Sequence, residues 1–468
     1  MAIIKGEPVQ EQSAKNQYLA ALVVSLQLTV YGIVTGWTSP NIELLKSDKS
    51  PLPSGSITVQ QAAWVGSLLA VGALPGNFIN GFLVAKFGRK WPLAATSIPM
   101  SVSWLLIMFA QNVSYLYVAR LLQGFALGGV LSISPVFLVE IADDRVRGIL
   151  GSSVPFGGAL GILIAFILGD YTDFIVTPIC GLVMSVIFFG LFSFFPETPI
   201  FLMRQNKIDE TEKSLQFYRN VRIEKSNYIK NEIQKLKNAV RGNDTEETTD
   251  RSLKLSDFTM KPGRNALIIA AVLALLNQLS GITTMISYTA TIFAAAGSTV
   301  SPNTSAMIVG ILQLIGTLAV TQLVDRFGRR FLYTVSTFGT SLGLVILGAY
   351  MMLGTFGVDL QAFNWIPIFA FSYTIFVSAL AIQALPIAVT AELMPDKLKE
   401  IGVAFAITLL STASFFVLYF FPILAQFIGF HSCLFFFAVV CLLSGLFLLK
   451  FLPETKGKSY EETMSSLR

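Results

Sequence analysis

Residues 265–324 read NALIIAAVLALLNQLSGITTMISYTATIFAAAGSTVSPNTSAMIVGILQLIGTLAVTQLV, without a single Asp, Glu, Lys or Arg. A helix that crosses the hydrocarbon core of a bilayer needs about 20 consecutive apolar residues. The run is therefore long enough for two crossings, and its turn-like middle at Gly297–Asn303 marks where they meet. This stretch predicts a protein built from membrane-spanning helices.

Nine further charge-free runs extend this pattern over the chain. The last of them breaks around Gly429-Phe430-His431 and is long enough for two spans. With 53% hydrophobic and 13% charged residues, the chain holds about half the charge of a soluble domain. The pattern predicts twelve helical spans and excludes a soluble enzyme. It disfavours a transmembrane β-barrel, whose strands are about ten residues long. The nine runs are 19–42, 50–85, 91–119, 121–139, 148–169, 174–196, 331–358, 360–391 and 401–449.

Charge asymmetry predicts the orientation of these spans. Of 33 Lys and Arg residues, only Lys46 and Lys49 fall in loops of one side, and Arg120 lies within a span. The rest fall in the tails and loops of the other side, which the positive-inside rule assigns to the cytoplasm together with both termini. The net charge of +5 therefore reflects topology and indicates no nucleic-acid partner. Because a lone charge within a span is expensive, we expect the Arg120 side chain to reach toward the outer membrane surface.

The same boundaries divide the chain into two bundles of six helices and three soluble pieces. The piece between the bundles is rich in charge of both signs, and it predicts a helical connector on the membrane-domain surface. The predicted parts are a cytoplasmic N-terminal tail at 1–17, a six-helix bundle at 18–196, a cytoplasmic helical linker at 197–264, a second six-helix bundle at 265–452 and a cytoplasmic C-terminal tail at 453–468.

Three short motifs occur twice in the same order, which indicates two homologous halves. Parallel repeats of this kind place a substrate site between the halves, near the bilayer midplane. The pairs are Gly81–Lys90 with Thr321–Arg330, Glu140 and Arg147 with Glu392 and Lys399, and Pro196-Glu197-Thr198 with Pro453-Glu454-Thr455.

All of these motifs fall at predicted cytoplasmic ends of spans. Charge-assisted hydrogen bonds between the glutamates that end spans and the basic residues that begin spans would close the cytoplasmic side, and they would break when it opens. Ordinary anchoring by basic residues is the alternative. The predicted gating residues are Glu140, Arg147, Arg89, Lys90, Glu392, Asp325, Arg329, Arg330, Glu197 and Glu454.

The motifs also carry a family resemblance. Residues 122–147 match the pattern Leu-x-Gly-Phe-x-x-Gly, then Phe-x-x-Glu, then Arg, and Gln278-Leu-Ser-Gly-Ile282 and Asp325-x-x-Gly-Arg-Arg330 add to it. With these motifs the chain resembles the sugar porters of the major facilitator superfamily, such as the insect facilitated trehalose transporters and the facilitative glucose transporters. The resemblance implies an all-α membrane protein with twelve helices in two pseudo-symmetric six-helix bundles. It also implies transport of a sugar by alternating access.

Amides within the spans are the candidate sugar ligands, because a carboxamide both donates and accepts hydrogen bonds, as a sugar hydroxyl does. The resemblance implies Gln278, Asn277 and Gln313 as ligands, and it places Thr283 where the family usually has Asn. Gln27 and Gln383 are further amides within spans. Hydrogen bonding between helices is the alternative for all five amides. The resemblance also aligns Tyr288 with a tyrosine of the outer gate, with a core aromatic as the alternative.

The predicted function is facilitated diffusion of a neutral sugar, trehalose or a hexose. No Asp or Glu lies in the middle of a predicted span, so no carboxylate is placed to load and release a proton. A non-transporting nutrient sensor on the same scaffold and a transporter of another neutral solute remain alternatives.

We expect no enzymatic activity, cofactor or metal site, because the chain has one histidine and no set of catalytic or metal-ligating residues. The expected partners are the sugar and the lipid bilayer, with the protein a monomer. The family resemblance implies a multi-pass protein of the plasma membrane. In spans ten and eleven the chain departs from the family pattern at Ala384–Ile387 and Leu410-Ser411, which removes groups typical of a glucose site.

Overall fold

The computed structural model of the protein describes residues 14–143, 145–220, 229, 232–238, 260–297, 300–395, 398–454, 456, 462 and 465. Every regular element of two or more turns in these residues is a helix. The side chains of Thr321, Asp325 and Glu400 lie outside the description, so the predicted gating role of Asp325 is not addressed by it.

The first half of the chain forms eight helices of the membrane region, followed by two short helices. The membrane helices are α1 (Lys15–Gly36), α2 (Thr38–Lys46), α3 (Val59–Phe87), α4 (Lys90–Ala95), α5 (Ser97–Met108), α6 (Val113–Ile141), α7 (Arg147–Tyr171) and α8 (Val176–Phe192). The short helices are α9 (Pro199–Arg204) and α10 (Ile208–Arg219).

The second half repeats this arrangement with more interruptions. Its helices are α13 (Lys261–Leu279), α14 (Ile282–Ser287), α15 (Thr289–Ala295), α16 (Pro302–Phe327), α17 (Arg329–Thr355), the 3₁₀ turn η1 (Gln361–Phe363), α18 (Ile366–Ala379), α19 (Pro386–Leu393), α20 (Lys399–Ile428) and α21 (Phe430–Phe451).

Eleven helices or pairs of consecutive helices in the described residues are long and apolar enough to cross a membrane, judged by length and composition. The helix α8 is a shorter apolar helix of 17 residues. Together these segments correspond one to one to the twelve predicted spans. Most of their surfaces are apolar on all sides, as expected for helices that contact lipid on one face and other helices on the opposite face.

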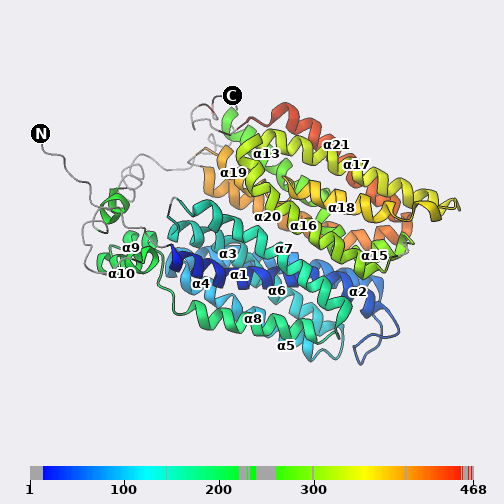
Figure 1. The fold of residues 1–468 in the computed structure, drawn as a ribbon, viewed down its shortest axis with the longest axis horizontal. Helices are drawn as coiled ribbons and strands as arrows, with labels where there is room; N and C mark the ends of the chain where they lie inside the picture. Colours follow the sequence, from blue (N-terminus) through cyan, green and yellow to red (C-terminus); the bar gives the residue numbers. More distant parts are fainter. Residues whose placement is uncertain are drawn as a thin grey trace, which may run out of the picture.

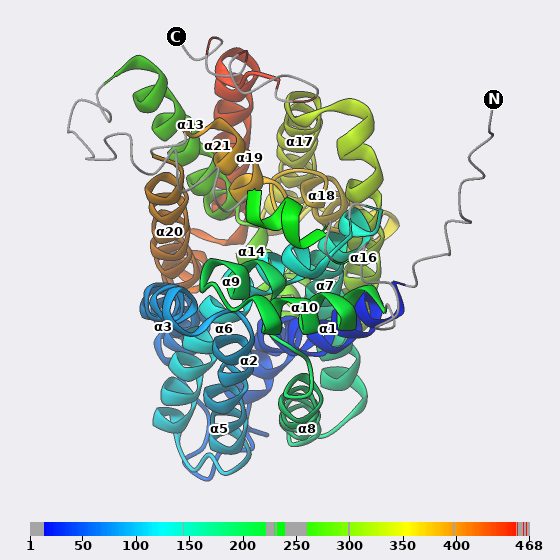
Figure 2. The ribbon, with the colours of Figure 1, turned by 90° about the vertical axis from the view of Figure 1, so that its left-hand side faces the viewer.

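The two halves lie side by side with their long helices roughly along the longest axis of the molecule (Figure 1). Helices α1–α8 form one group and α13–α21 the other, and α3 packs against α20 and α7 against α16 across the boundary. Helices α9 and α10 lie at one end, which we call the linker end. Figure 2 looks at this end and shows α9 and α10 nearest the viewer. The end that carries α2 and α15 is called the opposite end.

Helix α10 is attached to the first half. The Asn16 and Gln17 amides donate to the carbonyl oxygens of Phe217 and Tyr218 at 2.7 and 3.1 Å. The Tyr218 hydroxyl donates to the Pro196 carbonyl at 2.7 Å, and burial raises the pKa of this phenol well above its usual value. Arg219 donates to the Ile141 carbonyl at 2.9 Å. These contacts tie the start of the predicted linker to the N-terminal helices.

Several spans are broken rather than continuous. The break between α13 and α14 lies at Ser280-Gly281, where Gly281 has a φ of 75° that favours glycine. The span of α18 and α19 is interrupted by turns at residues 380–385. Irregular backbone within a membrane must find internal hydrogen-bond partners or line a cavity. The breaks therefore mark places where polar side chains are needed.

Candidate transport site and gates

Two amides at the end of α13 meet the interrupted span of α18 and α19. The Asn277 Nδ2 donates to the Ile382 carbonyl at 2.6 Å. The Gln278 Nε2 donates in turn to the Asn277 Oδ1 at 2.7 Å, and the Gln278 side chain is buried. Asn277 therefore satisfies a backbone oxygen that the turn segment has released, and it orients Gln278.

A second pair of amides meets at the neighbouring residue of the same break. The Gln313 Nε2 on α16 donates to the Gln383 Oε1 at 3.3 Å, and the Gln383 Nε2 donates to the Ser378 hydroxyl at 3.0 Å. The buried Gln313 Oε1 has no hydrogen-bond partner in the described part of the chain. Asn277 and Gln278 of α13 and Gln313 of α16 thus meet Gln383 at the turn segment between α18 and α19. These are four of the predicted ligands. The Gln313 Oε1 is thus an acceptor that a further donor could satisfy.

The other two predicted ligands are placed differently. Gln27 on α1 is fully buried, and its Nε2 lies 3.5 Å from the Thr96 hydroxyl at the α4–α5 junction. This contact belongs to the packing within the first half. Thr283 is half-buried in α14, just past the break at Gly281.

At the linker end of the first half, the duplicated motifs form a compact ionic cluster. The Arg89 Nη2 lies 2.8 Å from the Glu140 Oε1, and both side chains are only 10% exposed. The Thr198 hydroxyl donates to the Glu140 Oε2 at 2.5 Å. The Glu197 carboxylate accepts the backbone N–H groups of Arg89 and Lys90 at 3.0 Å each. Burial raises the pKa of Glu197, and these backbone hydrogen bonds oppose the shift.

The second half repeats this cluster with its own residues. The Arg329 Nη2 lies 3.1 Å from the Glu392 Oε1, with side chains 21% and 35% exposed. The Glu454 carboxylate accepts the backbone N–H groups of Arg329 and Arg330 at 2.9 and 3.1 Å. The Arg330 guanidinium donates to the Leu449 carbonyl. Each half thus holds its own copy of one cluster, in line with the duplication.

The glycines of the motifs explain why the carboxylates fit so closely. Gly88 and Gly328 end α3 and α16 with φ of 90° and 82°. A Cβ on either would lie 2.2 Å from the Glu197 Oε2 or 2.6 Å from the Glu454 Oε2. Only glycine allows both the turn and the approach.

Two other predicted gating residues, Lys90 and Arg147, are placed differently. Lys90 enters the cluster through its backbone, while its ammonium lies 4.6 Å from the Trp91 ring centroid. Arg147 begins α7 with an exposed side chain. The ion pairs Arg89–Glu140 and Arg329–Glu392 each join helices of the same half. They do not bridge the two halves themselves, so their gating role stays a prediction.

The halves are joined at the opposite end instead. In the part of the chain that the structure describes, two hydrogen bonds connect them. The Ala290 N–H donates to the Ser39 hydroxyl at 3.0 Å, and the Thr291 hydroxyl donates to the Glu43 Oε1 at 2.5 Å. The Trp64 ring of α3 also packs on Tyr419 of α20 with centroids 4.9 Å apart. Our sequence analysis missed Ser39, Glu43 and Thr291, because no repeated motif or unusual residue type marks them.

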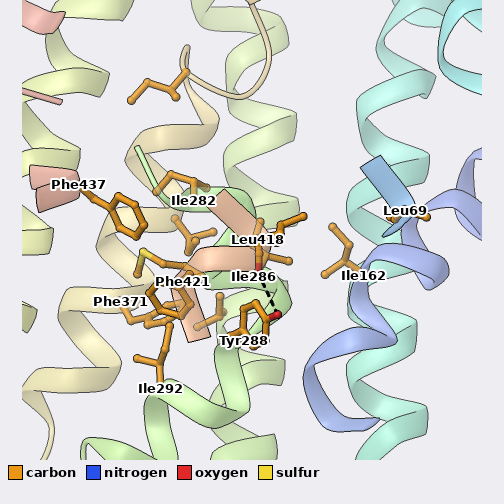
Figure 3. Packing of buried hydrophobic residues seen from close by; sticks show 14 of the residues in the cluster. Leu69, Ile162, Ile282, Ile286, Tyr288, Ile292, Phe371, Leu418, Phe421 and Phe437 are labelled. Carbon is orange, nitrogen blue, oxygen red and sulfur yellow. Dashed lines mark hydrogen bonds between the residues drawn. The ribbon is translucent and has the colours of Figure 1, made fainter. Parts of the chain in front are cut away.

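Tyr288 lies at the junction of α14 and α15 and is 2% exposed. Its hydroxyl donates to the Leu418 carbonyl at 3.2 Å, and its ring lies beside Phe421. Figure 3 shows this tyrosine between the apolar core of the second half and Leu69 and Ile162 of the first. A Cβ on Gly66 of α3 would lie 2.6 Å from the Tyr288 hydroxyl oxygen. The aromatic side chain therefore fills a notch in the other half, which a glycine keeps open.

The expectation for Arg120 was wrong. Its side chain is 1% exposed, so the guanidinium does not snorkel to an exposed position. The guanidinium donates to the carbonyls of Val65 and Val34 at 3.0 and 2.9 Å, to the Gln123 Oε1 at 3.0 Å and to the Thr38 hydroxyl at 2.9 Å. Hydrogen bonds to neutral groups compensate its burial. These partners lie up to 86 residues away, so inspection of α6 alone could not reveal them.

Residues 20–466 match the family model described as sugar (and other) transporters. The chain belongs to this family. It is 33% identical over 459 residues to a facilitated trehalose transporter Tret1 of Culex quinquefasciatus, covering 97% of this chain and 87% of that relative. It is 32% identical to the Bombyx mori facilitated trehalose transporter Tret1, covering 98% and 88%.

Solved structures support the predicted fold class. The inward-open conformation of the xylose transporter XylE from E. coli matches with a TM-score of 0.77 at 19% identity, covering 96% of this chain and 99% of that one. Its partially occluded inward-open conformation matches with a TM-score of 0.75. The protein therefore has the all-helical major facilitator fold, as predicted. Among the described residues, no group of three or more His, Cys, Asp or Glu side chains is placed to hold a metal ion.

Proposed function

We propose that this protein carries a neutral sugar, trehalose or a hexose, down its concentration gradient by alternating access of its two halves. The observation that carries this proposal is the convergence of Asn277, Gln278, Gln313 and Gln383 on the broken span at Ile382. These amides offer donors and acceptors without a charge, which suits hydroxyl groups. The names of the similar insect proteins favour trehalose as the first sugar to test.

Uncoupled transport is supported by what surrounds these amides. The groups that meet there are carboxamides, a backbone carbonyl and the Ser378 hydroxyl, none of which titrates near neutral pH. The buried cation Arg120 is held by neutral acceptors rather than by a carboxylate. A proton-coupled carrier needs a group that gains and loses a proton during the cycle.

In this proposal each half, 18–196 and 265–452, moves as a unit. The ionic clusters around Glu140 and Glu392 stiffen the linker end of each half, and Tyr288 closes the opposite end. The linker end faces the cytoplasm together with both termini, and the protein is a monomer in the plasma membrane. The excess of Lys and Arg at the linker end supports this orientation.

Radiolabelled uptake tests the proposal. Trehalose, glucose and fructose are offered to cells that lack their own carriers, with and without the protein. Saturable uptake that stops at equal concentrations inside and outside is expected for at least one of them. A sensor on this scaffold would bind sugar without moving it, and a carrier of another solute would move none of the three.

Two controls sharpen this experiment. Gln278→Ala should reduce uptake at least about tenfold, the loss expected when a buried hydrogen-bond partner is removed, with unchanged surface expression. Gln111→Ala, at an exposed site outside the helices, should leave it unchanged. Unaffected uptake in Gln278→Ala would contradict the site. Sugar accumulation in proteoliposomes under an imposed pH step would contradict uncoupled transport.

A further inference from the structure

Arg120 is a buried cation that connects separate segments of the first half. It reaches from α6 to Val34 near the end of α1, to Thr38 at the start of α2 and to Val65 on α3. Its guanidinium also lies 5.7 Å from the ring centroid of Trp37, the residue between α1 and α2. One side chain therefore connects the α1–α2 junction to α3.

Burying a charge is costly, and a hydrophobic residue of similar size is often as stable or more stable. Packing alone thus gives no reason for an arginine at this position. The planar guanidinium carries five donors in a fixed arrangement, and four of its hydrogen bonds are made here. A lysine has one nitrogen and cannot hold acceptors on three segments in the same way.

The segments that Arg120 holds form the surface that meets the second half. Gly66, whose notch receives Tyr288, directly follows Val65. The Thr38 methyl group lies 4.0 Å from the position of a Cβ on Gly66, so it borders the same notch. Ser39, which accepts the Ala290 N–H, directly follows Thr38. Every acceptor that Arg120 finds on α2 and α3 thus has a neighbour that contacts α14 or α15.

We propose that Arg120 is a positioning residue of the gate at the opposite end. It holds Thr38-Ser39 and Val65-Gly66 in the arrangement that receives Tyr288 and Ala290 when the halves close there. Arg120 touches no predicted ligand and acts through this docking surface. The inference rests on the alternating access of the proposed function, but its test needs no transported sugar.

The test measures how often this gate opens. A single cysteine at Ala290, a 2% exposed side chain in the gate, reports access from outside when the other cysteines (Cys180, Cys433 and Cys441) are replaced by serine. A membrane-impermeant maleimide is applied to intact cells. In this background Arg120→Lys should increase the labelling rate at least about fivefold, the lower end of typical coupling between two sites.

Two further variants separate positioning from general damage to the fold. Thr38→Val removes one acceptor of Arg120 and should raise labelling in the same direction by a smaller factor. Arg219→Lys changes another buried arginine that donates to a backbone carbonyl, but at the linker end, and should leave labelling at the parent rate.

A combination of variants tests the route of the effect. Tyr288→Ala alone should raise labelling, and adding Arg120→Lys should raise it little further, because both changes remove the same docking contact. Parent-like labelling of Arg120→Lys at normal surface expression would overturn the proposal, as would independent, multiplicative effects of the two changes. If Arg120→Lys does not reach the cell surface, the labelling rate of Thr38→Val tests the proposal instead. A parent-like labelling rate in Thr38→Val would then overturn the positioning role of Arg120.

Discussion

The two ends of the molecule are held together by different chemistry. At the linker end, ion pairs and carboxylate–backbone hydrogen bonds connect helices within each half. At the opposite end, hydroxyl groups, a backbone N–H, a carboxylate and aromatic rings connect one half to the other. Hydrogen bonds with charged groups are worth about 1.5–3 kcal/mol and neutral ones about 0.5–1.5. Of the two hydrogen bonds that join the halves in the described residues, only the one to the Glu43 carboxylate has a charged partner. Contacts with charged groups are therefore more numerous where parts must stay together than where parts must separate.

The largest expected effect comes from the linker end of the first half. Glu140→Gln should lower the free energy of unfolding by about 3 kcal/mol, because it leaves Arg89 buried without its partner. Glu392→Gln should cost only about 1 kcal/mol, because the matching pair is more exposed. Thermal unfolding of the purified protein in detergent measures both. Equal losses of unfolding free energy in Glu140→Gln and Glu392→Gln would show that the burial of an ion pair does not decide its contribution to stability.

The next effect concerns the notch at the opposite end. Gly66→Ala places a methyl group 2.6 Å from the Tyr288 hydroxyl oxygen, which is too close for the closed arrangement. Overpacking of this kind costs about 1–3 kcal/mol. The closed gate is disfavoured by that amount, so uptake should fall about tenfold while thermal stability changes little. Gly81→Ala on the same helix is the matched control, because a Cβ there meets nothing within 4 Å. Unchanged uptake in Gly66→Ala would show that the notch at Gly66 is not part of the gate.

A smaller effect is expected from the hydrogen bond between Thr291 and Glu43. Thr291→Val keeps the shape and removes the donor, weakening closure by about 1 kcal/mol, because the Glu43 carboxylate is 35% exposed and water screens its interactions. The outside labelling rate of a cysteine at Ala290 should rise about fivefold. Thr355→Val, at an exposed helix end far along the chain, serves as control. An unchanged or lower labelling rate would show that this contact does not hold the gate closed.

The smallest effect is a pH dependence at Glu197. Because burial raises its pKa in the folded protein, the folded state binds this proton more readily than the unfolded chain does. Stability from this group should therefore rise as pH falls from neutral through the raised pKa toward the ordinary value. Glu197→Gln should flatten that slope in unfolding measurements at pH 5–7. An unchanged slope would assign the pH dependence to other carboxylates.

The sequence predicted the spans and the repeated clusters well, because both depend on local pattern. Charge-free runs identify helices that contact lipid, and the duplicated Pro-Glu-Thr motif marks Glu197 and Glu454, which the structure places against equivalent backbone groups. The amides in spans seven, eight and ten were recognised because polar groups are rare in apolar segments.

What sequence reasoning missed depends on distant partners. Arg120 was expected near a membrane surface because a lone charge within a span is expensive. Two of its acceptors are backbone carbonyls, which every residue has, so the sequence does not indicate them. Ser39 and Thr291 resemble the other hydroxyl side chains that bond within their own helix. Gln27 met the same criterion as Gln278, yet its amide nitrogen lies beside the Thr96 hydroxyl rather than beside another candidate amide. Residue type shows which side chains are polar, but the orientation of each helix in the bundle decides what those side chains contact.

The attachment of α10 to Asn16, Gln17 and Ile141 has a practical consequence. Residues 14–143 and 145–220 include α10 at the linker end, and among the described residues they share few polar contacts with the remainder, one of which is the Arg219–Glu232 ion pair. Cutting the polypeptide after Asn220 and producing the two fragments together should let each insert separately and then assemble into a working carrier. The same site would accept a fluorescent protein without strain on either bundle.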